Sequence, residues 1–80
     1  MVKYVLEYKS TENPDAWNIA DEYLSSEFSE AKTDCLKYIE LPLVIAARIV
    51  CIDTTVIRTE FGRCEINDDG NVVRSGLLER

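Results

Sequence analysis

Residues 67–71, which read Asn-Asp-Asp-Gly-Asn, constrain the fold of this chain more than any other segment. An Asp-Gly step between two runs of β-forming residues is a strong signal of a β-hairpin, because the tight turn needs positive φ angles. Residues 63–66 lead into the turn, and residues 72–75 return from it. The same oxygen side chains would suit calcium, but a helix-flanked calcium loop needs glycine sixth and glutamate twelfth. Here glycine is fourth and the twelfth residue is Leu78, so we predict a turn and no metal site.

The patterns of three further segments predict β-strands. Residues 2–9 alternate apolar and polar side chains, which predicts a strand with one apolar face. Residues 46–53 are rich in β-branched side chains and predict a largely buried strand, with a short helical turn at 43–47 as an alternative at its start. Residues 55–61 alternate again and predict a half-exposed strand that continues to residue 66. Residues 76–80 are expected to form a loose tail.

Two segments between the first and second of these strands suggest helices. Residues 30–40 carry an apolar stripe at helical spacing, Ser29 is a suitable N-cap, and Pro42 stops the helix. Residues 14–24 allow two interpretations. A helix places Trp17, Ala20 and Leu24 on one stripe, whereas a strand places Trp17, Ile19 and Tyr23 on one face and leaves Asp21 as a misfit. We favour the helix, because Asn13-Pro14 resembles an N-cap followed by proline at the first helical position.

These elements predict one small α+β domain over residues 1–80, with an antiparallel sheet of about four strands and one or two helices packed on one face. A chain of 80 residues buries only about 60–65% of its unfolded surface, so it has little to divide between two domains. An open sheet has two edges, and edge pairing makes a homodimer a reasonable expectation.

The residues for common catalytic centres are missing. The sequence has no histidine, which excludes Cys-His and Ser-His-Asp centres within one chain. Its three cysteines, Cys35, Cys51 and Cys64, lack the paired spacing of a zinc site. We predict buried, reduced cysteines, no cofactor and no enzymatic activity, with a reactive Cys64 thiolate beside Arg63 as the alternative.

The cell compartment is expected to be the cytoplasm. The longest apolar run, residues 41–47, is broken by Pro42 and is far shorter than the roughly 20 residues of a transmembrane helix. Residues 1–9 alternate charged and apolar side chains and lack the apolar block of a signal peptide.

Charge is distributed unevenly along the chain. The net charge is −6, and residues 12–40 contain eight acids against two lysines. A patch of this sign attracts a basic protein surface and opposes direct binding of nucleic acid, whose recognition needs clustered lysine and arginine. The alternative is an ordinary solvated surface that keeps a small protein soluble. The arginines of the predicted strands are expected to form cross-strand ion pairs with acids, drawn from Arg48, Arg58, Arg63 and Arg74 against Asp53, Glu60 and Glu65.

In size, acidity and layout, the chain resembles the small phage-encoded inhibitors of bacterial defence known as anti-CRISPR proteins. The shared layout is one strand, an acidic helical stretch, and then several strands with an Asp-Gly hairpin. The resemblance implies a non-catalytic inhibitor that occupies the DNA- or RNA-binding surface of a defence complex, with carboxylates in place of phosphates. The alternative is a small regulatory or structural module that binds a protein through its sheet edge or exposed aromatic residues. If the chain is such an inhibitor, the clustering of its acids in the sequence predicts these contacts with the partner: Asp15, Asp21, Glu22, Glu27, Glu30 and Asp34.

Overall fold

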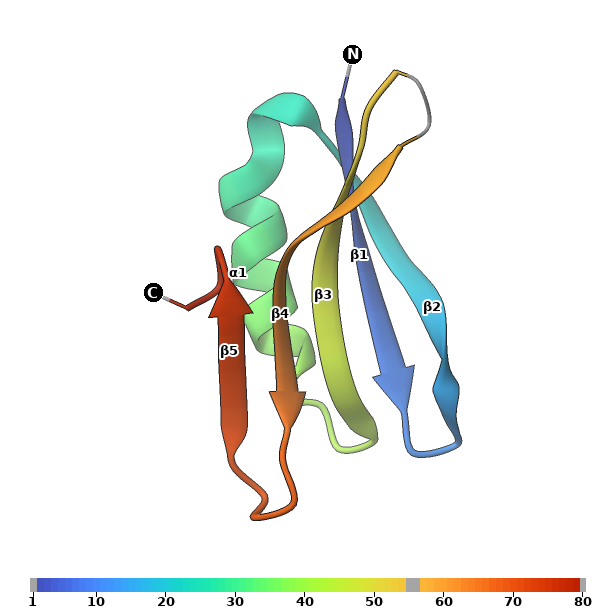
Figure 1. Ribbon diagram of the computed structural model, residues 1–80, viewed down its shortest axis with the longest axis vertical. Helices are drawn as coiled ribbons and strands as arrows, with labels where there is room; N and C mark the ends of the chain where they lie inside the picture. The colour runs from blue at the N-terminus through green and yellow to red at the C-terminus, as the bar shows by residue number, and fades with distance from the viewer. Residues whose placement is uncertain (1, 55–56, 80) are drawn as a thin grey trace.

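Five antiparallel strands form one sheet in the computed structural model of this protein, which describes residues 2–54 and 57–79. Within this part of the chain one α-helix packs on one face of the sheet (Figure 1), so the α+β class is confirmed. The strands lie in the order β2-β1-β3-β4-β5. In chain order the elements are β1 (Lys3–Ser10), β2 (Asn13–Leu24), the 3-10 turn η1 (Ser25–Glu27), α1 (Phe28–Tyr38), β3 (Val44–Ile52), β4 (Arg58–Ile66) and β5 (Val72–Gly76).

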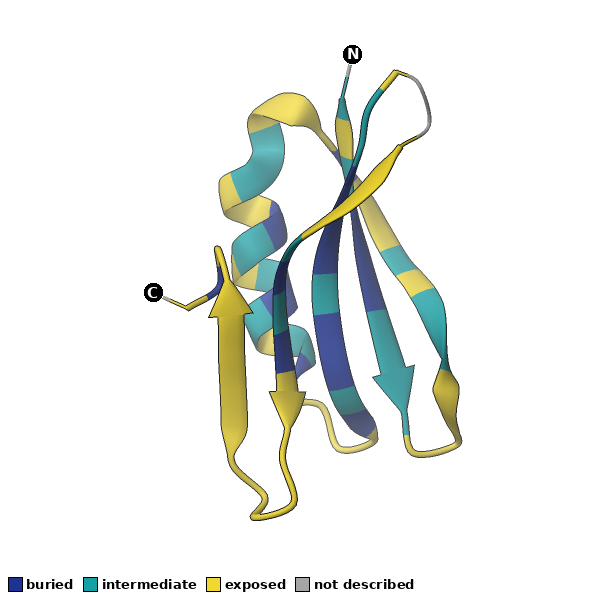
Figure 2. Cartoon of the chain, viewed as in Figure 1, coloured by how far each residue is buried: buried dark blue, intermediate teal, exposed yellow. Residues whose placement is uncertain are grey.

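The core lies between α1 and the two central strands. Figure 2 shows burial concentrated along β1 and β3, whereas β5 is exposed along its whole length. Leu6 of β1 stands opposite Ile49 of β3, and both side chains are fully buried. Tyr4 and Tyr8 share the face of Leu6 and pack against the same core, as the period-two pattern of residues 2–9 predicts.

The predicted second helix is confirmed, with shifted ends. Ala31, Cys35 and Ile39 are buried at a spacing of four residues and form the stripe that faces the sheet. Ser29 lies inside the first turn of α1 instead of capping it, and the Glu27 carboxylate accepts a hydrogen bond from the Leu24 N–H at 2.7 Å. At the other end the chain leaves the helix before Pro42, as the sequence predicts.

The predicted helix over residues 14–24 is wrong, because this segment is the edge strand β2. A β-bulge explains why its pattern is ambiguous. Leu6 pairs with Asp21 and Glu7 with Ile19, so Ala20 is an extra residue that shifts the side-chain alternation. Before the bulge Ile19 faces away from α1, and after it Asp21 faces α1. Neither a helical stripe nor a simple strand alternation fits such a segment.

The C-terminal residues also differ from the prediction. The hairpin turn is confirmed: Gly70 has a φ of 81°, and its N–H donates to the Asn67 carbonyl at 3.0 Å. The expected loose tail is wrong, since Leu78 is fully buried in the core. Gly76, with a φ of 61°, turns the chain so that Leu78 packs against Gly62.

Two smaller predictions concern the strand boundaries. Residues 44–47 belong to β3, so the alternative helical turn there is wrong. Of the strand predicted over 55–61, residues 55 and 56 lie outside the described residues, and β4 begins at Arg58. None of the helices in the described part of the chain has the length and apolar character that crossing a membrane requires.

Candidate functional site

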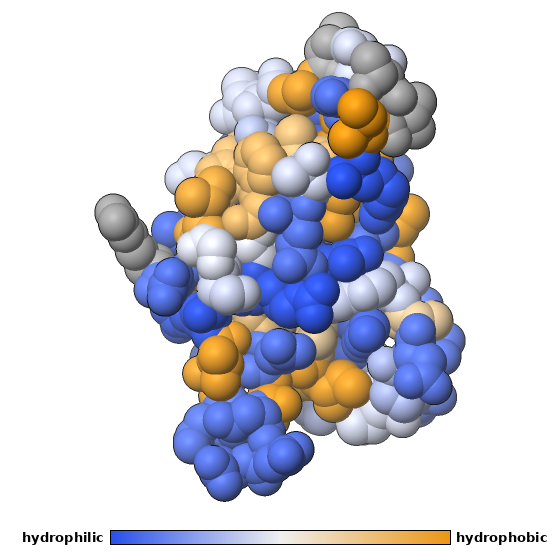
Figure 3. Space-filling model, in the orientation of Figure 1, coloured by the Kyte–Doolittle hydropathy of each residue, from blue (hydrophilic) through white to orange (hydrophobic). Residues whose placement is uncertain are grey.

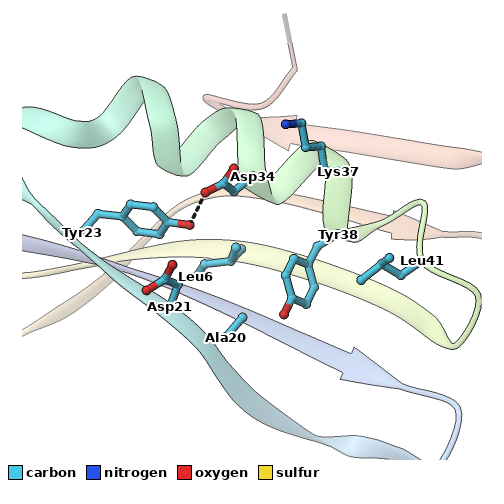
Figure 4. A pocket seen from close by; sticks show the side chains of 8 residues that line it. All are labelled: Leu6, Ala20, Asp21, Tyr23, Asp34, Lys37, Tyr38 and Leu41. Carbon is cyan, nitrogen blue, oxygen red and sulfur yellow. Dashed lines mark hydrogen bonds between the residues drawn. The ribbon is translucent and has the colours of Figure 1, made fainter.

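An apolar hollow opens between β2 and α1 beside two carboxylates. Its volume is about 300 Å³. Figure 4 shows the lining side chains, which come from β1, β2, α1 and the segment after the helix. Most of the lining is apolar or aromatic, and the residues are Leu6, Ala20, Asp21, Tyr23, Asp34, Lys37, Tyr38 and Leu41.

Two of the predicted partner contacts meet at this hollow. The Asp34 carboxylate accepts a hydrogen bond from the Tyr23 hydroxyl at 2.7 Å (Figure 4). Burial, and then this hydrogen bond, raise the pKa of the Tyr23 phenol above its ordinary value of 10.0. Asp21 enters the hollow because the bulge at Ala20 places it on the helix side of β2. In this lining the base Lys37 stands against the two acids Asp21 and Asp34, so the rim of the hollow is acidic on balance.

The other four predicted contacts lie elsewhere. Asp15 is exposed in β2, and Glu30 is exposed in the first turn of α1. Glu22 lies on the opposite face of β2 and forms an ion pair with Lys3 at 2.8 Å. Glu27 is half-buried where it bonds to the Leu24 N–H. The six acids are therefore spread over β2, η1 and α1, and of these six only Asp21 and Asp34 line the same hollow.

Two of these acids also shield the outer edge of the sheet. The Asp21 carboxylate accepts a hydrogen bond from the Glu22 N–H at 2.8 Å, and Glu27 does the same for Leu24. Edge strands with unbonded N–H groups invite pairing with other chains. The carboxylates therefore satisfy backbone donors at the end of β2 that an added strand would otherwise use.

The face of the sheet opposite α1 carries a network of ion pairs, and we call it the open face. Glu7 is buried there and binds Arg48 at 2.9 Å and Arg58 at 2.7 Å. Glu60 binds the same Arg48 at 3.3 Å and Arg63 at 2.7 Å. In Figure 3, which views this face, hydrophilic residues form a band across the middle of the molecule. The predicted cross-strand pair of Arg48 with Glu60 is thus confirmed. Arg63 binds Glu60 within β4, so its pair is not cross-strand, and the central acid, Glu7, was not among the predicted partners.

Trp17 completes the open face. Its ring lies 4.1 Å from the Arg48 guanidinium, 5.2 Å from that of Arg63 and 4.7 Å from the Lys9 ammonium. Such distances are those of cation–π contacts. The prediction that places Trp17 with Ala20 and Leu24 on one helical stripe is therefore wrong: Trp17 is half-buried and covers the arginines of the ion-pair network.

The cysteines are buried, as predicted. All three are free thiols, and Cys64 lies against Cys35, with its Sγ 3.9 Å from the Cys35 carbonyl oxygen. A hydrogen bond with Cys64, together with burial, raises the pKa of the Cys35 thiol. Arg63 is on the open face and Cys64 is fully buried on the helix side, so Arg63 is the wrong activating group. The pKa of the Cys64 thiol is lowered mainly by its hydrogen bond with Cys35 and also by the charge of Arg74. No group of three cysteine or acidic side chains within residues 2–54 and 57–79 is close enough to hold a metal ion.

Comparison with known proteins gives no relative: no protein-family model, no curated protein and no solved structure matches this chain.

Proposed function

We propose that this protein is a non-catalytic, anti-CRISPR-like inhibitor that binds a basic protein surface through the acids of β2, η1 and α1. We call these acids together the acidic side. The observation that supports this most is the meeting of Asp21 and Asp34 beside an apolar hollow. Carboxylates next to a low-dielectric surface attract a cationic side chain more strongly than carboxylates in open solvent do.

The sequence distribution of charge supports the same proposal. Six of the eight acids of residues 12–40, with both lysines of that segment, lie in the adjoining elements β2, η1 and α1, whereas most arginines lie in β3 and β4. The exposed acids among them, Asp15, Asp21 and Glu30, can compete with phosphates for lysine and arginine. The anti-CRISPR resemblance suggests that the partner is the nucleic-acid-binding surface of a bacterial defence complex, in the cytoplasm.

The test is capture of partners from a host lysate at low and high salt, followed by mass spectrometry. We expect a nucleic-acid-binding complex to be captured at low salt and lost at high salt, because salt screens surface charges. The variant Asp15→Lys/Glu30→Lys should lose this partner. Both residues are exposed, so the fold should be retained.

The matched control is Asp68→Lys/Asp69→Lys, which makes the same charge change in the β4–β5 hairpin. This control should retain the partner. Equal loss in the two double variants would mean that only net charge matters, and capture that resists high salt would argue against the acidic side altogether.

A second function, pairing of sheet edges into a homodimer, is favoured by β5. All five residues of this edge strand are exposed, including Val72 and Val73. Sedimentation at increasing protein concentration tests it. A dimer that dissociates in the Val73→Lys variant would support a regulatory or structural module that pairs through its sheet edge. A monomer at all concentrations would exclude such a dimer.

A further inference from the structure

A second apolar hollow adjoins the first. It has a volume of about 440 Å³ and is lined mainly by Tyr8, Pro42, Leu43 and Val44, with Leu41 shared between the two hollows. Tyr38 lines the first hollow and Tyr8 the second, and their rings are 5.3 Å apart. The surface is therefore a groove with two depressions that runs from β2 past the end of α1.

Exposed leucines border this groove. Leu41 is 47% exposed and Leu43 is 52% exposed, although each is a large apolar residue. Exposed apolar patches of this kind mark interaction surfaces more often than isolated exposed side chains do. A covering partner would remove both leucines from water and gain free energy from their burial.

The rim of the groove is acidic. Asp21 and Asp34 lie at the first hollow and Glu12 at the second, against the single base Lys37. An occupant that buries its own apolar side chains here would bring adjacent positive charges close to these carboxylates. A negative or neutral apolar segment would lack that gain.

We propose that the groove binds an extended segment of the protein partner in which apolar side chains alternate with lysine or arginine. Two alternate apolar side chains fill the two hollows, and a long cationic side chain next to the first of them reaches the rim carboxylates Asp21 and Asp34. Two adjoining hollows fit alternate side chains of one extended segment better than a single compact molecule. This inference rests on the proposed function and adds the apolar component of recognition to it.

The test uses short synthetic peptides and the ¹⁵N-labelled full chain. In the first peptide leucine and arginine alternate; in the second serine replaces leucine; in the third glutamate replaces arginine. Calorimetry measures affinity, and amide chemical shifts locate the site. We expect the leucine–arginine peptide to bind and to shift the amides of Ala20, Tyr38 and Leu41, and the other two peptides to bind about tenfold more weakly or not at all.

Matched variants separate the two components of binding. Leu41→Ser should lose about tenfold in affinity, whereas Leu77→Ser, at a leucine of similar exposure outside the groove, should lose none. Asp21→Asn retains an oxygen for the Glu22 N–H but loses the charge, so it should also weaken binding. Asp68→Asn, in the far hairpin, should not. Circular dichroism confirms that each variant is folded.

Several results would overturn the inference. Equal affinity for the serine and leucine peptides would show that charge alone drives binding, in which case the proposed function survives and this inference fails. No binding of the leucine–arginine peptide would also reject the groove, while the lysate capture above decides the proposed function separately. Self-association that Leu41→Ser abolishes would assign the groove to a second copy of the chain.

Discussion

Gly76 lets the end of the chain return to the core. A Cβ atom at this position would lie 2.5 Å from the Phe61 carbonyl oxygen, and its φ of 61° disfavours other residues. The next residue, Leu77, donates its N–H to that same oxygen at 2.8 Å. Leu78 then reaches the interior beside Gly62.

We predict that Leu78→Ala lowers the free energy of unfolding by about 2–5 kcal/mol, because it removes buried methyl groups and leaves a cavity. Urea denaturation measures the change. Leu77→Ala is the control, since Leu77 is 52% exposed and its truncation should cost less than about 0.5 kcal/mol. Similar losses in the two variants would contradict the buried position of Leu78.

Tyr23 links stability to alkaline pH. Its pKa is raised in the folded state by burial and by the bond to Asp34, so the folded protein keeps a proton that the unfolded chain releases near pH 10.0. This contribution is complete below that pH and is lost as pH rises towards the folded-state value.

We therefore expect Tyr23→Phe to lose less free energy of unfolding than the natural chain between about pH 9 and pH 11. Cys35 titrates in the same direction but is present in both proteins, so it does not affect the difference. Equal losses in urea denaturation at the two pH values would show that Tyr23 does not couple folding to pH.

At the scale of elements, the open face depends on an acid in the central strand β1. Glu7 holds one arginine from β3 and one from β4. Removing one partner of a buried ion pair leaves the others uncompensated and typically costs about 3–5 kcal/mol. Arg58 is 44% exposed and can turn to solvent, so we predict a loss of about 3 kcal/mol for Glu7→Gln.

Urea denaturation followed by the fluorescence of Trp17, the single tryptophan, measures this loss at the network itself. Glu60→Gln is the control: its carboxylate is more exposed, and its removal should cost at most about 1 kcal/mol. A larger effect at Glu60 than at Glu7 would mean that the exposed acid organises the network.

The sequence predicts those elements whose pattern is uninterrupted. Residues 2–9 and the stripe from Ala31 to Ile39 each follow one period, and the turn at 67–71 depends on a local Asp-Gly step. All three predictions are confirmed. The sequence offers the strand β2 only as the alternative to a helix, because the bulge interrupts the period at Ala20. The burial of Leu78 was not predicted, because it depends on the absence of a side chain at Gly62. No local sequence pattern encodes a contact between residues so far apart in the chain.

The candidate site was predictable in part for the same reason. Clustering along the sequence identified Asp21 and Asp34 among the acids, but their meeting depends on the bulge and on the packing of α1 beside β2. Nothing local distinguishes them from Glu22, which turns to the opposite face. The exposed residues Leu41 and Leu43 were a signal in the sequence, since a hydrophobic run around Pro42 is unusual for a loop.

For the whole molecule, charge is divided between elements. Acids gather in β2, η1 and α1, although Glu22 of β2 lies on the open face beside Lys3, and the arginines of β3 and β4 pair with Glu7 and Glu60 on the open face. We predict that salt affects binding more than stability, because the acids Asp15, Asp21 and Glu30 are exposed while Glu7 is shielded from solvent. Denaturation and partner capture over the same salt range compare the two. A fold that melts at the salt concentration that releases the partner would contradict this division.

The strand order has a consequence for how quickly the chain folds. The sheet consists of two units of neighbouring hairpins: β1 with β2, and β3 with β4 and β5. The single ladder between β1 and β3 joins the two units across the middle of the sheet. Hairpins close short loops, whereas this ladder must close a loop of about forty residues, as the Glu7–Arg48 pair shows. Val5 and Val50 face each other there. We expect Val50→Ala to slow refolding in stopped-flow experiments, and Leu78→Ala mainly to speed unfolding, so that the rate at which this protein forms is set at the junction of its two halves.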